Sequence, residues 1–140
     1  MYQLHQRLQQ DTFYLGQLTL CDVLLMNDAR YPWVILVPRR EDITEIHQLN
    51  EAEQQQLMTE SVFVAKQLSS LVSADKMNTA ALGNVVSQLH IHHVARYQTD
   101  EAWPGPVWGK GEAVMYSPDE AKAVAEQLIT TFSELLRYGG

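Results

Sequence analysis

Five short runs rich in β-branched and apolar residues constrain the fold of this 140-residue chain more than any other feature. Three of them follow one another near the N-terminus, and two come after a long stretch with helical periodicity. Consecutive strands joined by short loops favour antiparallel pairing, so the sequence predicts an α+β fold with an antiparallel five-stranded sheet. We expect a single domain over residues 1–140, with strands at 12–18, 20–26, 33–37, 76–82 and 88–94.

Capping signals predict two long helices. The first begins at Asn50, with Glu53 three residues later, and follows the third strand. The second, at the C-terminus, begins at residues 117–120, a Ser-Pro-Asp-Glu capping box with proline at the first helical position. Its apolar residues recur with the helical period until Gly139-Gly140 ends the pattern. A short amphipathic helical turn is also expected around residues 4–8.

Composition limits the classes of function. Ten Lys and Arg stand against seventeen Asp and Glu, which gives a formal net charge of −7. Binding along a phosphate backbone depends on a basic surface, so a nucleic acid polymer is not an expected partner. The sequence shows no signal peptide, no apolar run near the roughly 18 residues of a membrane span, and one cysteine, Cys21, that cannot form an internal disulfide. We therefore expect a soluble, cytoplasmic protein without a membrane partner.

The most informative segment carries three of the five histidines within four residues: His90, His92 and His93. Side chains alternate between the two faces of a strand, so Gln88, His90 and His92 share one face. The alternate residues form a mainly apolar face that is expected to meet the core: Leu89, Ile91, His93 and Ala95.

Three interpretations of the polar face compete: a solvated surface on which histidine is incidental, a metal site, or a site of nucleophilic catalysis by imidazole. His-x-His can supply two ligands to zinc or iron, but no spaced cysteine or Glu-x-x-His pattern indicates the others. A neutral histidine can attack phosphorus if its other ring nitrogen holds a hydrogen bond. The Gly83-Asn84 turn before the histidines and Arg96 after them suit a small bound anion, which favours the third interpretation.

Residues 83–96 resemble the signature of the histidine triad (HIT) nucleotide hydrolases and transferases, which is His-φ-His-φ-His-φ-φ with φ apolar. In that family a Gly-Gln turn precedes the signature and Pro-Arg often follows it. Gly83, seven residues before His90, and Arg96, six residues after it, fix the register. His90 then matches the family's middle, nucleophilic histidine, and His92 matches the third.

Four positions depart from that signature, one of them Val85, where the family often has a Ser or Thr that touches phosphate. Gln88 stands at the first triad position, Asn84 replaces the glutamine of the turn, and Ala95 replaces the proline. Gln88 cannot titrate, but its side-chain carbonyl can orient a neighbouring imidazole N–H, so attack by His90 remains feasible.

The resemblance extends upstream to residues 24–38, which look like the family's ribose-binding strand and loop. Asn27 is the best match to the residue that holds the ribose hydroxyls, with Asp28 beside it, although the pair is also typical of an ordinary turn. Phe13 and Leu25 are candidates for a base pocket and, equally, for the core. The expected site thus has catalytic residues His90, His92 and Gln88, and substrate-binding residues Asn27, Asp28, Asn84, Gly83 and Arg96.

The resemblance implies cleavage of a nucleoside monophosphate from a phosphate-linked leaving group, through a covalent nucleotidyl-histidine at His90. It further implies a homodimer and no required cofactor, with a divalent metal able to accompany the nucleotide. The alternatives are a non-catalytic nucleotide-binding module of the same fold and a histidine-dependent metal enzyme. The charge of −7 does not oppose a nucleotide, because local donors can hold one phosphate. The segment 103–108, with two tryptophans, is expected to pack on the domain body or on a second subunit.

Overall fold

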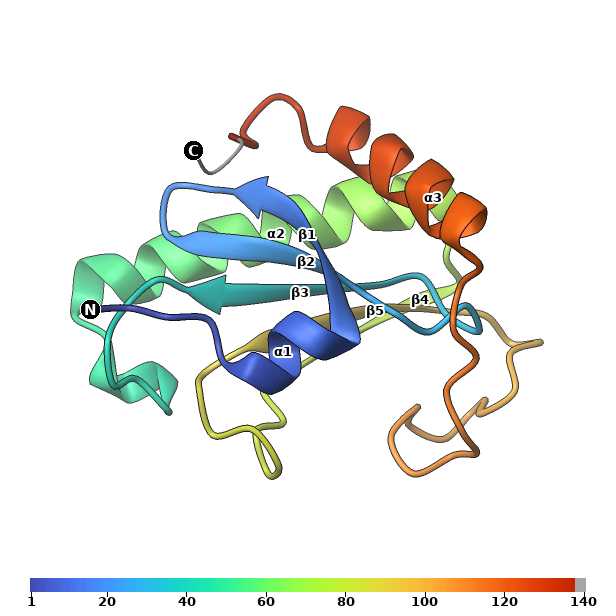
Figure 1. Cartoon of the computed structure of the whole chain (residues 1–140), viewed down its shortest axis with the longest axis horizontal. Coiled ribbons are helices and arrows are strands. Elements are labelled where there is room, and N and C mark those ends of the chain that lie inside the picture. The colour runs from blue at the N-terminus through green and yellow to red at the C-terminus, as the bar shows by residue number, and fades with distance from the viewer. Residues whose placement is uncertain (138–140) are drawn as a thin grey trace.

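The sheet predicted from the sequence is present in the computed structural model, which describes residues 1–137 (Figure 1). Its strands lie in the order β1-β2-β3-β5-β4, and each neighbouring pair is antiparallel. The strands are β1 (Thr12–Gln17), β2 (Cys21–Met26), β3 (Trp33–Pro38), β4 (Lys76–Ala80) and β5 (Ile91–Arg96). The helices are α1 (Gln6–Asp11), α2 (Glu51–Val72) and α3 (Pro118–Thr131), with a short 3-10 helix, η1 (Ile46–Gln48), before α2. The α+β prediction is confirmed.

Side-chain caps explain where the two long helices begin. The Asn50 side chain accepts a hydrogen bond from the Glu53 N–H, and the Glu53 side chain accepts one from the Asn50 N–H. Ser117 and Glu120 form the same reciprocal pair at the start of α3. Each pair satisfies N–H groups that have no partner inside the helix.

The C-terminal helix is shorter than its apolar periodicity predicts. α3 ends at Thr131, although the pattern continues to Leu136. The chain turns after Thr131 because Leu136 enters the core and Arg137 pairs with Gln17 at the edge of β1. Tertiary contacts thus end the helix before the pattern ends. The predicted helix end at Gly139-Gly140 lies outside the described residues.

Both faces of the sheet are covered. One face carries the larger core, in which Leu25 packs with residues of α2 and α3 such as Leu128. The opposite face carries a second core, in which Leu8 of α1 clusters with Trp33 and with Val107 from the loop before α3. Figure 1 shows α1 in front of the sheet and α2 behind it. As a result, all six residues of β5 are buried.

The histidine segment enters the sheet later than predicted. β5 covers Ile91–Arg96 rather than 88–94. The residues just before it leave the ladder: the Leu89 N–H donates to the carbonyl of Ile43, outside the sheet. His90 therefore stands immediately before β5, beside the loop that precedes the strand.

Candidate active site

His90 has one ring nitrogen engaged and the other available. Its Nδ1 lies 2.7 Å from the backbone carbonyl oxygen of Gln88. A carbonyl oxygen only accepts, so Nδ1 carries the proton and Nε2 keeps its lone pair. Burial lowers the pKa of His90 below its usual value and outweighs the opposing effect of the Gln88 hydrogen bond, and the nearby His5 lowers the pKa further. At neutral pH His90 is an uncharged imidazole of fixed tautomer, the form that acts as a nucleophile.

His90 lines a cleft of about 240 Å³, which we call the His90 cleft. Its walls come from segments far apart in the sequence: α1, the end of β2, the loop before β5, and Trp108. The residues that form these walls with His90 are Arg7, Leu8, Asp11, Met26, Leu82, Asn84, Val85, Val86 and Trp108. A group that enters the cleft therefore meets an imidazole, an amide, the ion pair of Arg7 and Asp11, and otherwise apolar surface.

Gly83 lets the turn approach the catalytic candidate closely. A Cβ added to Gly83 would lie 2.8 Å from the carbonyl oxygen of Val86 and 3.9 Å from Cε1 of His90. The first distance is too short for a real contact, so the turn requires glycine at this position. Asn84, the next residue, lines the cleft. The structure thus brings Gly83, Asn84 and His90 together.

His92 lies against His90 but is not part of the cleft wall. The two ring centroids are 4.8 Å apart and the rings meet edge to face. The indole N–H of Trp33 donates to Nδ1 of His92 over 3.0 Å, and Trp108 packs on the same ring with a centroid distance of 5.1 Å. Burial, followed by the effect of His90, lowers the pKa of His92 to about 3. His92 is therefore a neutral ring whose Nδ1 is already hydrogen-bonded, and it packs against the ring of His90.

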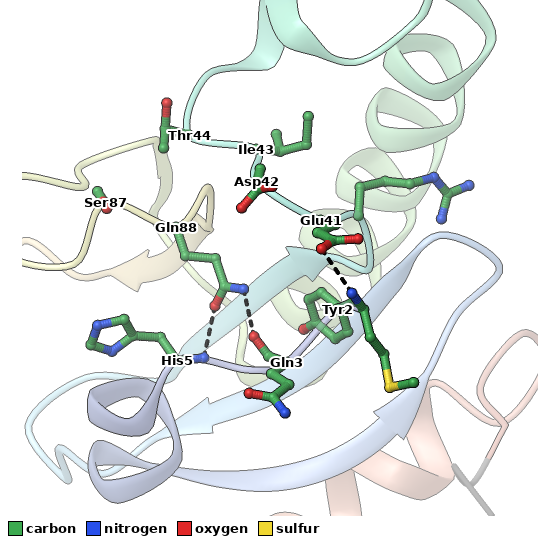
Figure 2. A pocket seen from close by; sticks show the side chains of 11 residues that line it. Tyr2, Gln3, His5, Glu41, Asp42, Ile43, Thr44, Ser87 and Gln88 are labelled. Carbon is green, nitrogen blue, oxygen red and sulfur yellow. Dashed lines mark hydrogen bonds and ion pairs between the residues drawn. The ribbon is translucent and has the colours of Figure 1, made fainter.

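The side chain of Gln88 binds the N-terminal segment. Its Oε1 accepts the backbone N–H of His5 and its Nε2 donates to the carbonyl of Gln3, each over 2.8 Å (Figure 2). This differs from the predicted role, in which the side-chain carbonyl of Gln88 orients an imidazole. That oxygen is occupied by His5, and the backbone carbonyl of Gln88 orients His90 instead.

Asn27 and Asp28 hold the loop that leads to α3. Asn27 Oδ1 accepts the backbone N–H of Tyr116 over 2.9 Å, and the carboxylate of Asp28 is paired with Arg30. Burial would raise the pKa of Asp28, but the hydrogen bonds from Arg30 outweigh it and hold the pKa below its usual value. Asn27 also borders a second hollow of about 320 Å³. That hollow and the His90 cleft share three wall residues: Arg7, Asp11 and Met26. The two hollows therefore adjoin, and Asn27 borders the second of them, whereas Asp28 is engaged by Arg30.

The structure does not bring Arg96 to the cleft. Its side chain is 2% exposed and donates to both carboxylate oxygens of Asp100, at 2.8 and 3.0 Å. It also donates to the side-chain oxygen of Asn78 and to the carbonyl of Gly105. These hydrogen bonds engage the guanidinium and hold the loop after β5, so Arg96 does not contact a phosphate in the His90 cleft.

The tryptophan segment packs on the domain body. The ring of Trp108 meets Trp33 edge to face, with centroids 5.8 Å apart, and Trp103 lies beneath the guanidinium of Arg96. Both tryptophans thus contact their own chain, as the first of the two predicted alternatives expects. The loop fixed by Arg96 therefore delivers Trp108 to His92 and to the cleft.

Of the two alternatives for Phe13 and Leu25, a base pocket or the core, the structure shows the core. Phe13 and Leu25 pack in the core beneath α2 and α3. Leu8 and Val86, which line the His90 cleft, belong to the core on the opposite face. Side chains alternate between the two faces along β1 and β2, so neighbouring residues of one strand pack on opposite faces of the sheet.

His93 takes no part in the cleft. It is fully buried, its Nε2 lies 2.6 Å from the hydroxyl of Ser61 in α2, and its Nδ1 lies 3.2 Å from the carbonyl of Val34. Burial lowers the pKa of His93 to about 4, against the opposing effects of the backbone of Val34 and Ile91. As predicted, His93 faces the core side of the strand.

Nowhere in residues 1–137 do three His, Cys, Asp or Glu side chains gather in a way that could hold a metal ion. None of the helices in the same range is long and apolar enough to cross a bilayer.

The chain is similar to known proteins in sequence and in fold. The model of the HIT domain family matches residues 7–99. The fold is similar to that of a histidine triad protein from Marinobacter aquaeolei VT8, at 52% sequence identity and a TM-score of 0.94, over 96% of this chain and 98% of that one. A HIT protein from Sinorhizobium meliloti 1021 is 43% identical, with a TM-score of 0.90, over 94% of this chain and 97% of that one. A histidine triad protein from Bradyrhizobium japonicum is also 43% identical, with a TM-score of 0.88, over 97% and 98% of the two chains. No curated protein matches. The chain belongs to the histidine triad family.

Proposed function

We propose that this protein is a nucleotide hydrolase or nucleotidyl transferase in which His90 is the nucleophile. The observation that carries the proposal is the 2.7 Å contact between His90 Nδ1 and the Gln88 carbonyl, which leaves Nε2 unprotonated at the cleft. The substrate is a nucleoside monophosphate joined to a phosphate-linked leaving group, as in a dinucleoside polyphosphate or a nucleoside phosphoramidate.

The reaction takes two displacements at phosphorus. In the first, the lone pair of His90 Nε2 forms an N–P bond while the bond from phosphorus to the leaving group breaks, and the electron pair leaves with that group. The imidazole then carries a positive charge, which the Gln88 carbonyl stabilises by accepting the Nδ1–H bond. In the second, water or another acceptor attacks phosphorus, the N–P bond breaks, and a proton is released to solvent.

The turn before β5 supplies stabilisation for the phosphoryl oxygens. Asn84 lines the cleft and can donate through its amide, as can backbone N–H groups of the turn that Gly83 makes. His92 acts differently, as a positioning residue, because its Nδ1 is bonded to Trp33. Together with Trp108 it gives His90 a rigid, dry support.

The nucleoside extends toward Asn27. Its Oδ1 is bonded to Tyr116, so the group that Asn27 can still offer a ribose hydroxyl is its amide nitrogen. The hollow at Asn27 shares wall residues with the His90 cleft, which supports a single ligand reaching both.

We further propose that the protein acts as a homodimer without a resident cofactor, a divalent metal accompanying the nucleotide where the substrate requires one. The homodimer proposal is supported by β4, which lies at the edge of the sheet beside α2, whose Met58 and Val62 are 64% and 56% exposed. Sedimentation equilibrium tests it directly: a monomer at micromolar concentration contradicts it.

Turnover of a panel of adenylate conjugates tests the function. His90→Asn keeps a polar side chain but has no ring nitrogen that can attack phosphorus, so we expect kcat/KM to fall by at least roughly a thousandfold. His47→Ala, at an exposed histidine, is the matched control and should leave the rate unchanged. Equal rates for the wild type and His90→Asn would contradict the proposal.

The same panel separates a non-catalytic nucleotide-binding module, the alternative suggested by the non-titrating Gln88. That alternative predicts adenylate binding by the wild type without turnover of any conjugate. Loss of activity on chelation, with metal present in the purified protein, would instead favour a metal enzyme.

A further inference from the structure

We propose that Gln88 is a positioning residue which fixes the N-terminal arm, residues 1–11, as a wall of the substrate site. This inference deepens the proposed function and rests on it for its kinetic part. Gln88 stands where the family signature has a histidine. In this chain its side chain joins two segments that are more than 80 residues apart in the sequence.

The contact between Gln88 and the arm resembles a pair of backbone hydrogen bonds. Oε1 accepts the N–H of His5 and Nε2 donates to the carbonyl of Gln3, so one amide serves a donor and an acceptor two residues apart (Figure 2). A primary amide offers both functions from one planar group, whereas a carboxylate only accepts. Gln88 is therefore suited to this task in a way that Glu is not.

The arm in turn forms part of the His90 cleft. The carbonyl of His5 accepts the N–H of Gln9, and the Nδ1 of His5 accepts the N–H of Arg7, so the residue bonded to Gln88 also begins α1. α1 contributes three residues to the cleft wall: Arg7, Leu8 and Asp11. Moving the start of α1 would therefore move one wall of the cleft.

Gln88 also belongs to the catalytic segment itself. Its side chain holds the arm, while its backbone carbonyl holds Nδ1 of His90. One residue thus sets the distance between the arm and the proposed nucleophile. Other contacts anchor the arm to the domain, notably buried Leu8 and the Tyr2 hydroxyl on Asp22, so loss of Gln88 should loosen the arm without unfolding the domain.

Hydrogen exchange with mass or NMR detection tests the contact independently of activity. The backbone N–H of His5 donates to Oε1 of Gln88. Gln88→Met keeps the length of the side chain but removes this acceptor, so the exchange rate of the His5 amide should rise by at least about tenfold. Gln88→Glu keeps the acceptor and should leave the His5 amide protected. Gln3→Met is the matched control, since the Gln3 side chain is exposed and its carbonyl is retained. An unchanged His5 amide in Gln88→Met would overturn the proposal.

Kinetics then test whether the arm is a wall of the site. For Gln88→Met we expect KM for an adenylate conjugate to rise roughly threefold to tenfold with kcat within about twofold, and a smaller rise for Gln88→Glu. A fall in kcat alone would mean that Gln88 acts on His90 directly, and an unchanged KM would mean that the arm does not contact substrate. Either result overturns the proposal. If the wild type turns over no conjugate, the proposed function fails, and the exchange experiment still decides the contact.

Discussion

His90 illustrates how much of this site depends on the surroundings of one side chain. The neighbouring residues in the sequence identify it, because glycine and arginine at fixed spacings select one register among three histidines. Its chemical state does not follow from sequence. The tautomer is set by the backbone carbonyl of Gln88, and the lowered pKa is set first by burial.

This state predicts the pH dependence of the proposed reaction. Because burial lowers the pKa of His90 below its usual 6.5, the nucleophilic, neutral form is fully populated at and above neutral pH. The rate should fall as the pH drops, with an apparent pKa below 6.5 in the profile of kcat/KM. A profile with its midpoint above 6.5 would mean that His90 is more exposed or differently bonded than described.

Arg96 and Gln88 show which residue roles cannot be predicted from a signature. Both occupy signature positions, and both are used for structure: Arg96 holds Asp100, and the Gln88 side chain holds the arm. Their partners lie in segments that the signature does not include. Position in the motif therefore did not predict the contacts that these two side chains make.

At the scale of elements, local signals predicted the strands and helix starts. The capping pairs at Asn50 and Ser117 act within one turn, and strand propensities act within a few residues, so the sequence carries them. The His90 cleft was not predictable in the same way, because α1, the 82–86 loop and Trp108 meet only after the sheet has formed. The early end of α3 has the same cause.

A contact between α2 and β2, which the sequence did not predict, involves the buried carboxylate of Glu60. Glu60, 1% exposed in α2, accepts the backbone N–H groups of Leu20 and Cys21 at the start of β2. Glu60→Ala leaves these buried donors without a partner, so we expect the free energy of unfolding to fall by about 2–4 kcal/mol. Urea denaturation measures it, with exposed Gln55→Ala on the same helix as the control, which should change stability by less than about 0.5 kcal/mol. Equal effects of the two variants would contradict this role for Glu60.

For the whole molecule, buried histidines couple stability to pH. Folding lowers the pKa of His92 to about 3 and of His93 to about 4, while the unfolded chain has histidines near 6.5. Between these values the unfolded chain binds more protons, so stability is complete above about pH 6.5 and is lost as the pH falls toward 4. The lowered pKa of Asp100, at about 2 beside Arg96, continues the loss below pH 4.

Thermal denaturation from pH 8 to pH 4 measures this coupling. We expect a constant midpoint temperature above pH 7 and a steady fall below pH 6.5. His93→Gln, which cannot titrate, should reduce the slope in that window even if it lowers stability overall. A slope that is unchanged in this variant would show that His93 does not contribute.

The net charge of −7 bears on how the whole molecule can bind a nucleotide. Arg7, in the walls of both hollows, is paired with Asp11, and Arg30, beside Asn27, is paired with Asp28. Arg96, in the signature segment, is paired with Asp100. Binding of a nucleotide must then rely on local donors such as Asn84 and backbone N–H groups rather than on a basic surface. The acidic composition is consistent with a small phosphorylated substrate.

The central claim is a covalent bond between phosphorus and His90, and rapid-quench labelling tests it most directly. A labelled adenylate donor is mixed with the protein, quenched within one turnover, and the labelled residue is located by peptide mass spectrometry. The account predicts one adenylate on His90, absent in His90→Asn and retained in His47→Ala. Label on His92, or turnover of the same donor with no labelled residue at any quench time, would contradict it.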